Sequence, residues 1–354
     1  MDLLPSEEQN EIADTVRAQL EADFDLHALA ERDFEPSVVD PVLWSRCAEL
    51  GWFSLGLAEA DGGIGYGTPE EALLFEEIGA HATPGPFLAT VLAAHVAAAA
   101  GERDLVESIT TGSLRVAGAE PEAAPDGPEP ASGTVAVRVT DWHGADLVLL
   151  LRGRTAQLHS TDGLHFDEQL SFDPLVPLAV TELDPSPSGG TGTGSLRCAV
   201  EDPSIALRAT VLAAAELAGI ARATAEQSST YAMDREQFGR PVGSFQAVKH
   251  RCVDMAVRAE AAVQLTRLAS LAVQGHIGAD GGHPDAPFQA EAAWVTAARA
   301  AVENAEVNVQ NHGGIGFTYE HTAHRYVTRA RVRSFAGGGL RGHMAALLSA
   351  DAPA

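Results

Sequence analysis

The stretch "YAMDREQFGRPVGSFQAVKH", residues 231–250, places an arginine beside a pattern that ends helices. Gly239 is followed two residues later by Pro241, an order typical of a helix end. We therefore expect Arg235 and Gln237 in the last helical turn, where their side chains can project into a neighbouring cavity. An arginine binds a pyrophosphate in two-pronged fashion, because its planar N–H donors match two phosphate oxygens. An anion-binding corner is one interpretation, and an ordinary helix–helix corner with solvated charges is the other.

A second stretch, "QNHGGIGF" at residues 310–317, follows a predicted helix and has three glycines within four residues. Such a loop lets the phosphates or the ring of a ligand lie against bare backbone amides. Its spacing matches neither a dinucleotide-binding fingerprint nor a P-loop, both of which follow a strand. By its pattern alone the stretch is only a turn.

Metal and disulfide chemistry find little support in the sequence. His321 and His324 could be taken for a metal-binding pair, but no carboxylate or cysteine cluster accompanies them, so we predict no metal site. The three cysteines, Cys47, Cys198 and Cys252, are far apart and odd in number. This spacing argues against a disulfide framework or a zinc knuckle and fits a reduced cytoplasm.

The composition limits the kinds of molecule that the chain can bind. The 354-residue chain carries 23 Lys and Arg against 49 Asp and Glu, and this net charge of −26 disfavours nucleic acid. Residues 1–20 lack a basic segment followed by an apolar one, and no later segment reads as a transmembrane helix. We expect a cytoplasmic protein with no membrane partner.

The elements that must position the two glycine-containing stretches follow a helical, β, helical order. Residues 1–112 show apolar residues at three-to-four spacing after a capping signal at Ser6. Short β-type runs fill residues 113–200, and Asp162-Gly163 predicts a hairpin turn there. Long alanine-rich helical segments occupy residues 201–354, which predicts an antiparallel bundle that also buries apolar surface against other subunits. The fold class is therefore α+β.

Three stretches in this order resemble the acyl-CoA dehydrogenase family: "LWSRCAELGWFSLGLAEADGGIGYG", "REQFGRPVGSFQAVKHRCVDM" and "HGGIGFTYEHTAHRYVTRARV". The resemblance implies an α-helical N-terminal domain (1–112), a middle β domain (113–200) and a C-terminal four-helix bundle (201–354) that builds a dimer of dimers. It also implies FAD at a dimer interface, an acyl-CoA substrate and electron-transferring flavoprotein as the electron acceptor.

In this family the two subunits that flank a flavin contribute different parts of its site. One subunit supplies the helix corner and the glycine loop, which here correspond to Arg235, Gln237, Phe238, Gln310, Gly313 and Gly314. The other supplies middle-domain contacts, among which Thr140 matches a flavin hydrogen-bonding position. The family's acidic-proline motif with Gly and Ser reads here "AEPEAAPD", residues 119–126, and lacks both. The resemblance thus implies an intact half-site of the first kind and an eroded half-site of the second kind.

The family's catalytic base, a glutamate, has two known positions, and neither carries one here. Counted from Phe317, the usual position falls on Gly337, and the rarer one, counted back from Arg235, falls on Ala209. Glu216 is seven residues beyond Ala209 on the same predicted helix, about 10 Å along the axis, which is too far to reach the same proton. We expect Glu216 to be paired with an arginine such as Arg222, or to be buried at a subunit contact.

These features imply a base-deficient subunit that works beside a second acyl-CoA dehydrogenase-like chain in an α2β2 heterotetramer. Such heteromeric relatives act on steroid side-chain acyl-CoAs, so a bulky acyl group is expected. Two alternatives stay open: a self-sufficient homotetramer or flavin oxidoreductase with an unrecognised base such as Glu216, and a structural or regulatory chain that binds no flavin.

Overall fold

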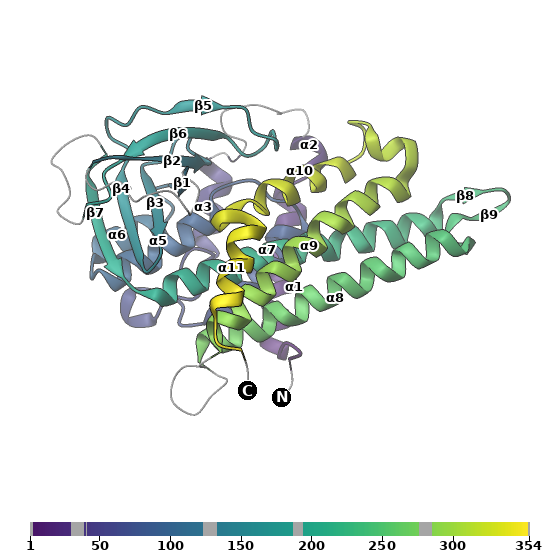
Figure 1. Ribbon diagram of the computed structural model, residues 1–354, viewed down its shortest axis with the longest axis horizontal. Helices are drawn as coiled ribbons and strands as arrows, with labels where there is room; N and C mark the ends of the chain where they lie inside the picture. Colours follow the sequence, from purple (N-terminus) through teal and green to yellow (C-terminus); the bar gives the residue numbers. More distant parts are fainter. Residues whose placement is uncertain are drawn as a thin grey trace. The chain divides into compact units, whose positions relative to one another are not determined.

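The computed structural model describes residues 3–29, 39, 41–122, 133–186, 194–275 and 285–352 (Figure 1). They fall into two compact units. The first comprises Met1–Glu31, Thr68–Thr83 and Thr210–Ala354, and the second comprises Arg32–Gly67 and Pro84–Ala209. The helical, β, helical order along the chain is the predicted one. Each unit, however, collects segments that lie far apart in the sequence, and the boundaries placed after residues 112 and 200 stay predictions.

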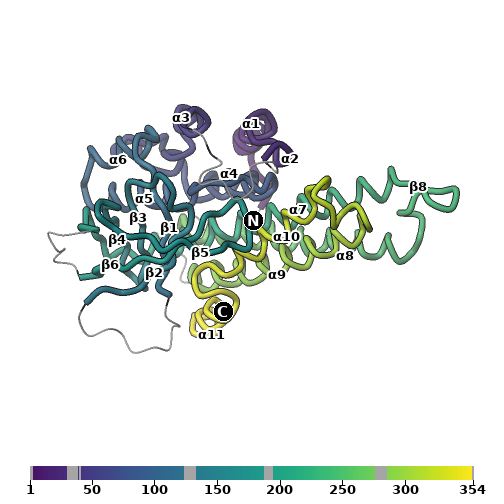
Figure 2. Tube along the Cα trace, turned by 90° about the horizontal axis from the view of Figure 1, so that it is seen from above, coloured from purple at the N-terminus to yellow at the C-terminus, as the bar shows by residue number. Residues whose placement is uncertain are grey.

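The first unit is built from long helices. They are α1 (Glu7–Asp23), α2 (Leu26–Leu29), α4 (Thr68–Ala80), α7 (Pro203–Asp234, from Thr210 onward), α8 (Gln246–Gln274), α9 (Ala286–His312), α10 (Ala323–Arg333) and α11 (Gly339–Ser349), with short turns η3 (Val242–Ser244), η4 (Gly313–Phe317) and η5 (Ala336–Gly338). Helices α8 and α9 run antiparallel and side by side (Figures 1 and 2). Their facing surfaces are rich in buried alanine, which allows the two backbones to come close.

The capping signal at Ser6 is confirmed at the start of α1. The Ser6 hydroxyl accepts a hydrogen bond from the Gln9 backbone N–H at 3.2 Å, and the Gln9 side chain accepts one from the Ser6 N–H at 2.9 Å. This reciprocal pair satisfies two backbone donors that the first turn leaves unpaired.

The second unit is a seven-stranded mixed sheet with helices. In spatial order its strands are β5 (Asp167–Gln169), β6 (Leu178–Leu183), β2 (Val135–Thr140), β1 (Val116–Pro121), β3 (Leu147–Arg152), β4 (Thr155–Ser160) and β7 (Leu196–Glu201), accompanied by α3 (Pro41–Glu49), η2 (Glu59–Asp61), α5 (Phe87–Ala99) and α6 (Arg103–Thr110). Only the β1–β3 pair is parallel among the described strands. Alternate residues of β2, Val137 and Val139, are fully buried, and α5 lies against β1.

The hairpin predicted at Asp162-Gly163 is wrong. Gly163 does adopt the left-handed conformation that a tight turn requires, with φ 72°. However, β4 pairs with β3 and β7, whereas β5 pairs with β6. The turn therefore redirects the chain to the other edge of the sheet instead of joining adjacent strands.

The expectation that no segment is long and apolar enough to span a membrane also needs correction. Among the described residues, one helix, α7, meets that criterion by length and composition. Most of its apolar stretch, 61%, is buried inside the protein. A buried core helix of a folded protein has the same composition, so the feature is weak evidence for a membrane span.

Helices α4 and α7 touch through their backbones at two glycines. A β-carbon on Gly79 would overlap the carbonyl of Glu216, and one on Gly219 would overlap the carbonyl of Glu76. Only glycine leaves room for this approach. The close crossing brings charged side chains of the two helices within reach of each other.

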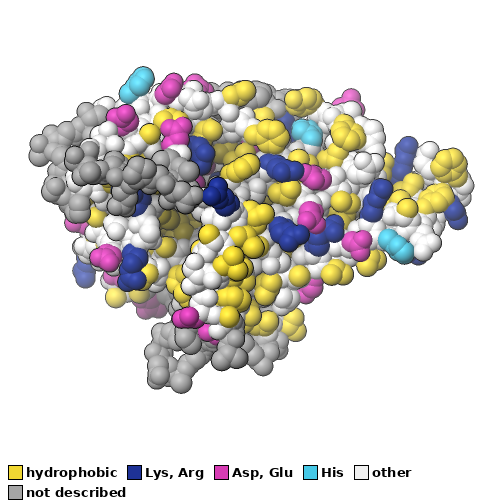
Figure 3. Space-filling model, in the orientation of Figure 1, with side chains coloured by type: hydrophobic (Ala, Val, Ile, Leu, Met, Phe, Trp, Pro, Cys, Tyr) yellow, Lys and Arg dark blue, Asp and Glu magenta, His cyan; other side chains and the backbone are white. Residues whose placement is uncertain are grey.

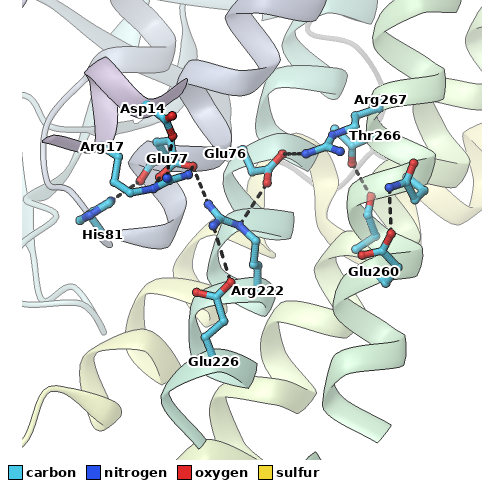
Figure 4. A network of polar contacts seen from close by, with 12 residues as sticks. Asp14, Arg17, Glu76, Glu77, His81, Arg222, Glu226, Glu260, Thr266 and Arg267 are labelled. Atoms are coloured by element: carbon cyan, nitrogen blue, oxygen red, sulfur yellow. Dashed lines mark hydrogen bonds and ion pairs between the residues drawn. The ribbon is translucent and has the colours of Figure 1, made fainter. Parts of the chain in front are cut away.

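Those charges form a network that links four helices (Figure 4). Glu77 of α4 accepts hydrogen bonds from Arg222 of α7 at 2.7 Å and from Arg17 of α1 at 2.8 Å. Glu76 lies 3.1 Å from Arg222 and 3.4 Å from Arg267 of α8. The side chains of Glu77 and Glu76 are only 3% and 10% exposed, so their charges depend on these cations.

Candidate functional site

The stretch that was predicted to end a helix forms a small hairpin at the end of α7. The helix stops at Asp234, Arg235 comes directly after it, and Gln237 lies on β8 (Glu236–Gln237), which pairs with β9 (Arg240–Pro241). Arg235 and Gln237 are therefore one to three residues beyond the last turn, a correction to the sequence-based placement. The reason is the turn between the strands, where Phe238 and Gly239 both have positive φ, 55° and 75°.

Phe238 is unusual in two respects. It is a bulky residue in the left-handed conformation, which costs free energy in the isolated chain. Its side chain is also 91% exposed at the tip of the hairpin. An exposed aromatic residue held in a strained backbone is a feature of binding surfaces.

The hairpin and the start of α8 (Gln246–Gln274) are locally basic in an acidic protein. Residues 235–251 contain four basic side chains (Arg235, Arg240, Lys249, Arg251) and one acidic side chain (Glu236). Basic side chains are visible around this end of the helical unit, at the right in Figure 3. This local positive charge attracts an anionic ligand that the chain as a whole, at −26, would repel.

The glycine loop begins where α9 ends. Gly313 has φ 64° and ψ −139°, a conformation open to glycine, and its N–H bonds the carbonyl of Gln310. A β-carbon at Gly313 or Gly314 would meet nothing within 4 Å, whereas one at Gly316 would approach the Val309 carbonyl at 2.7 Å. Gly316 is thus needed for packing, and the first two glycines leave an open backbone face for a ligand.

The structure brings these two motifs to the same end of the helical unit. The ring of Tyr231, one turn before Arg235, lies 4.3 Å from that of His312, the last residue of α9. Asn308 accepts a hydrogen bond from Ser228 at 2.7 Å and donates one to Gln227 at 2.9 Å, so α7 and α9 are held together there.

Thr140 belongs to the other unit. It ends β2, opposite Gly118 of β1. A β-carbon at Gly118 would lie 3.5 Å from the Thr140 hydroxyl. Of the eroded motif at 119–126, the structure describes only the first four residues, and 123–126 lie outside the described part of the chain.

At Gly337, the position expected for the catalytic base, a neighbouring histidine occupies the space that a side chain would need. Gly337 has φ 62°, and a β-carbon on it would lie 2.5 Å from Nε2 of His343. His343 is fixed by a 2.6 Å contact of its Nδ1 with Glu291 and by stacking on Trp294, with ring centroids 3.6 Å apart. Sequence reasoning missed this arrangement, because the three residues are brought together by the packing of α11 on α9.

The alternative carboxylate, Glu216, is bound in an ion pair. Its side chain is 4% exposed and accepts a 2.8 Å hydrogen bond from Nε of Arg333 on α10. Its partner is not Arg222, which pairs with Glu76 and Glu77. The Arg333 guanidinium and the surrounding protein therefore occupy the space around this carboxylate. Ala209, the other expected base position, lies on α7 with only a methyl side chain.

The sequence comparisons identify the family. The family model for the acyl-CoA dehydrogenase N-terminal domain matches residues 6–108, and that for the C-terminal domain matches residues 208–346. The chain belongs to the acyl-CoA dehydrogenase family.

Among individual proteins, the chain is similar to acyl-CoA dehydrogenases of Mycobacterium tuberculosis. It is 35% identical to FadE34 over 84% of this chain, but spans only 40% of that relative's length. It is 29% identical to IpdE2 over 82% of this chain and 80% of that relative. Among solved structures, the Tcur3481-Tcur3483 steroid acyl-CoA dehydrogenase variant matches with TM-score 0.76 and 25% identity over 96% of both chains. The ChsE4-ChsE5 complex from Mycobacterium tuberculosis shares the fold, with TM-score 0.81 and 23% identity over the full length of both chains.

Acyl-CoA dehydrogenases are flavoproteins, and FAD is the cofactor of the family. The residues at the hairpin end fit a dinucleotide. Arg235 is exposed and offers a planar donor fork, and the open backbone at Gly313 and Gly314 admits a close approach. The cationic surroundings of the hairpin match the double negative charge of a pyrophosphate.

Proposed function

We propose that this chain is a subunit of an FAD-dependent acyl-CoA dehydrogenase and contributes the pyrophosphate-binding half of a flavin site to a catalytic partner chain. One observation carries the proposal: the two flavin-binding motifs meet at one exposed end of the helical unit, while Gly337, the usual base position, is closed by His343. In this proposal the chain supplies the pyrophosphate-binding half of an active site, and the partner chain supplies the catalytic half.

The reaction of such a complex is α,β-dehydrogenation of an acyl-CoA thioester. A carboxylate of the partner chain removes the proton from the carbon next to the thioester. Bound FAD would supply the acceptor for the hydride from the neighbouring carbon. In this chain, Arg235 neutralises the pyrophosphate, Gln237 and Gln310 offer side-chain amides, and Phe238 covers the ligand from the hairpin tip.

The partner in this proposal is a second acyl-CoA dehydrogenase-like chain in a cytoplasmic α2β2 heterotetramer. The names of two structural neighbours support it, because both are pairs of different chains, Tcur3481-Tcur3483 and ChsE4-ChsE5. The word "steroid" in the first name supports a bulky, steroid-like acyl-CoA as substrate. Electron-transferring flavoprotein is the proposed acceptor.

Expression of the chain alone and together with the product of the neighbouring gene tests this function. We expect the pair to co-purify with half as many flavins as a homotetramer would hold. Acyl-CoAs should bleach the flavin absorbance of the pair only. Full FAD occupancy and bleaching by the chain alone would instead establish the self-sufficient homotetramer with a non-standard base.

The Arg235→Ala variant of the complex is expected to bind FAD about 10- to 100-fold more weakly. This is the loss of a charge-assisted hydrogen bond of about 1.5–3 kcal/mol. Flavin fluorescence titration of the apo-complex measures it. Arg299→Ala is the matched control, because Arg299 is 67% exposed on α9, about 20 Å before the helix end. Equal FAD affinity in both variants would contradict the assignment of Arg235.

A further inference from the structure

Four histidines gather around the glycine loop. His321 lies with its ring 4.3 Å from that of His312, and its electrostatic neighbours are His312 of α9, His27 of α2 and His324 of α10. On its other side, His312 contacts the phenol ring of Tyr231 of α7. Among the residues that the structure describes, no group of three or more His, Cys, Asp or Glu side chains is arranged to hold a metal. The arrangement of these histidines therefore does not support a metal site in the described part of the chain.

One hydrogen bond of the cluster, at His321, requires a neutral imidazole, whereas the bond from His312 to Asn308 forms in either protonation state. His321 Nδ1 accepts a 3.1 Å hydrogen bond from the backbone N–H of Ala323, the first residue of α10. Only an unprotonated nitrogen can accept, so a protonated His321 loses this bond and places a positive charge at a helix N-terminus. His312 uses Nδ1 to donate to the Asn308 carbonyl at 2.8 Å, which leaves Nε2 without its proton in the neutral ring.

Burial and mutual repulsion disfavour the charged forms. The pKa of His312 is lowered by burial, and the pKa of His321 is lowered first by burial and then by His312, His27 and His324. A histidine whose folded-state pKa is depressed stabilises the fold while it is neutral, above its ordinary pKa of about 6.5. That stabilisation is lost as the pH falls below this value, so acid loosens the cluster.

The cluster is directly connected to the glycine loop and the hairpin. His312 precedes Gly313, and a β-carbon on Gly316 would lie 3.0 Å from Cβ of His312, so the loop folds back on this residue. The Tyr231 carbonyl accepts a 2.9 Å hydrogen bond from the Arg235 N–H, one turn further along. A shift of the His312 ring would therefore also shift the glycine loop and the hairpin that carries Arg235.

We propose that His312 and His321 are positioning residues that hold the glycine loop and the Arg235 hairpin in their FAD-binding arrangement only while both rings are neutral. Binding of the dinucleotide by this half-site then weakens on acidification. The inference rests on the proposed function, because it presupposes that this end of the helical unit binds FAD.

The FAD affinity of the complex between pH 8 and pH 5.5 tests the inference. Because the pKa values of His312 and His321 are lowered, we expect the affinity to fall only on the acid side of the ordinary histidine pKa of about 6.5, by at most about tenfold per pH unit for each linked proton. In His321→Asn, the amide oxygen can replace Nδ1 as acceptor but does not titrate, so the FAD affinity of this variant should change less between pH 8 and pH 5.5 than that of the parent, whatever its affinity at pH 8. His165→Asn, a change of an exposed histidine in the other unit, is the control and should keep the parental profile.

A second measurement needs no variant. Calorimetry at pH 6 in two buffers of different ionisation enthalpy should show that the parental complex releases protons when it binds FAD. A flat pH profile, or no proton release, with FAD bound at pH 8 would overturn this inference and leave the proposed function intact. Absence of FAD binding at every pH would overturn the proposed function and the inference with it.

Discussion

Replacement of Arg222 by alanine is expected to lower the free energy of unfolding by about 3–5 kcal/mol, because it removes one partner from a buried charge network. Arg222 lies 2.7 Å from Glu77 and 3.1 Å from Glu76, whose side chains are almost fully buried. Without the guanidinium, two carboxylates face each other in a poorly solvated region. Arg17 stays in contact with Glu77, and Arg267 stays in contact with Glu76, so the network weakens but does not disappear.

Urea unfolding followed by circular dichroism measures this effect. Arg299→Ala is again the matched control, since it removes an exposed arginine whose contact with Glu303 is 3.9 Å long. An exposed pair of this kind contributes at most about 1 kcal/mol. Similar losses in both variants would show that the network of Figure 4 does not stabilise the protein.

The elements predicted well are those determined by local sequence. The helical, β, helical order follows from apolar periodicity, and the cap of α1 follows from the spacing of Ser6 and Gln9. The glycine loop was placed correctly after a helix, because His312 ends α9 directly before Gly313.

The features that the sequence did not reveal depend on contacts between distant segments. Helix α4 joins the C-terminal helices through the meeting of Gly79 and Gly219, a contact that no local pattern encodes. The Asp162-Gly163 turn was recognised, but the strands it connects pair with other neighbours. Propensity describes a turn, whereas strand pairing is decided by the packing of the whole sheet.

Contacts between distant segments also limited what the sequence could predict about the candidate site. The types and spacing of Arg235, Gly313 and Gly314 allowed either a phosphate site or an ordinary helix corner and turn, and only the family resemblance pointed to the pyrophosphate. The structure adds that Tyr231 and His312 bring the two stretches together. The hairpin after α7 was missed because a Gly–x–Pro pattern marks a helix end without specifying the conformation of the residues beyond it.

Gly337→Glu is expected to destabilise the chain and to leave it unable to bleach flavin with an acyl-CoA, although it restores a carboxylate at the usual base position. The left-handed backbone at this site, with φ 62°, lowers the free energy of unfolding by about 1–2 kcal/mol for a residue with a β-carbon. It also meets His343 Nε2 at 2.5 Å, and overpacking of this kind costs about 1–3 kcal/mol more. His343 cannot easily retreat, because Glu291 and Trp294 hold its ring.

Gly338→Glu separates the two costs. Gly338 is also left-handed, with φ 86°, but a β-carbon there meets nothing within 4 Å. Gly338→Glu should therefore lose only the free energy that the positive φ costs. Gly337→Glu should be less stable than Gly338→Glu by about 1–3 kcal/mol, and should unfold at a lower urea concentration. Equal stabilities would mean that His343 does not close the position. Flavin bleaching by the Gly337→Glu chain without a partner would mean that a carboxylate at this position is sufficient for activity. If instead His343 excludes a side chain at position 337, one substitution there is not sufficient for activity, because His343 of α11, held on α9 by Glu291 and Trp294, occupies the space that the new side chain needs.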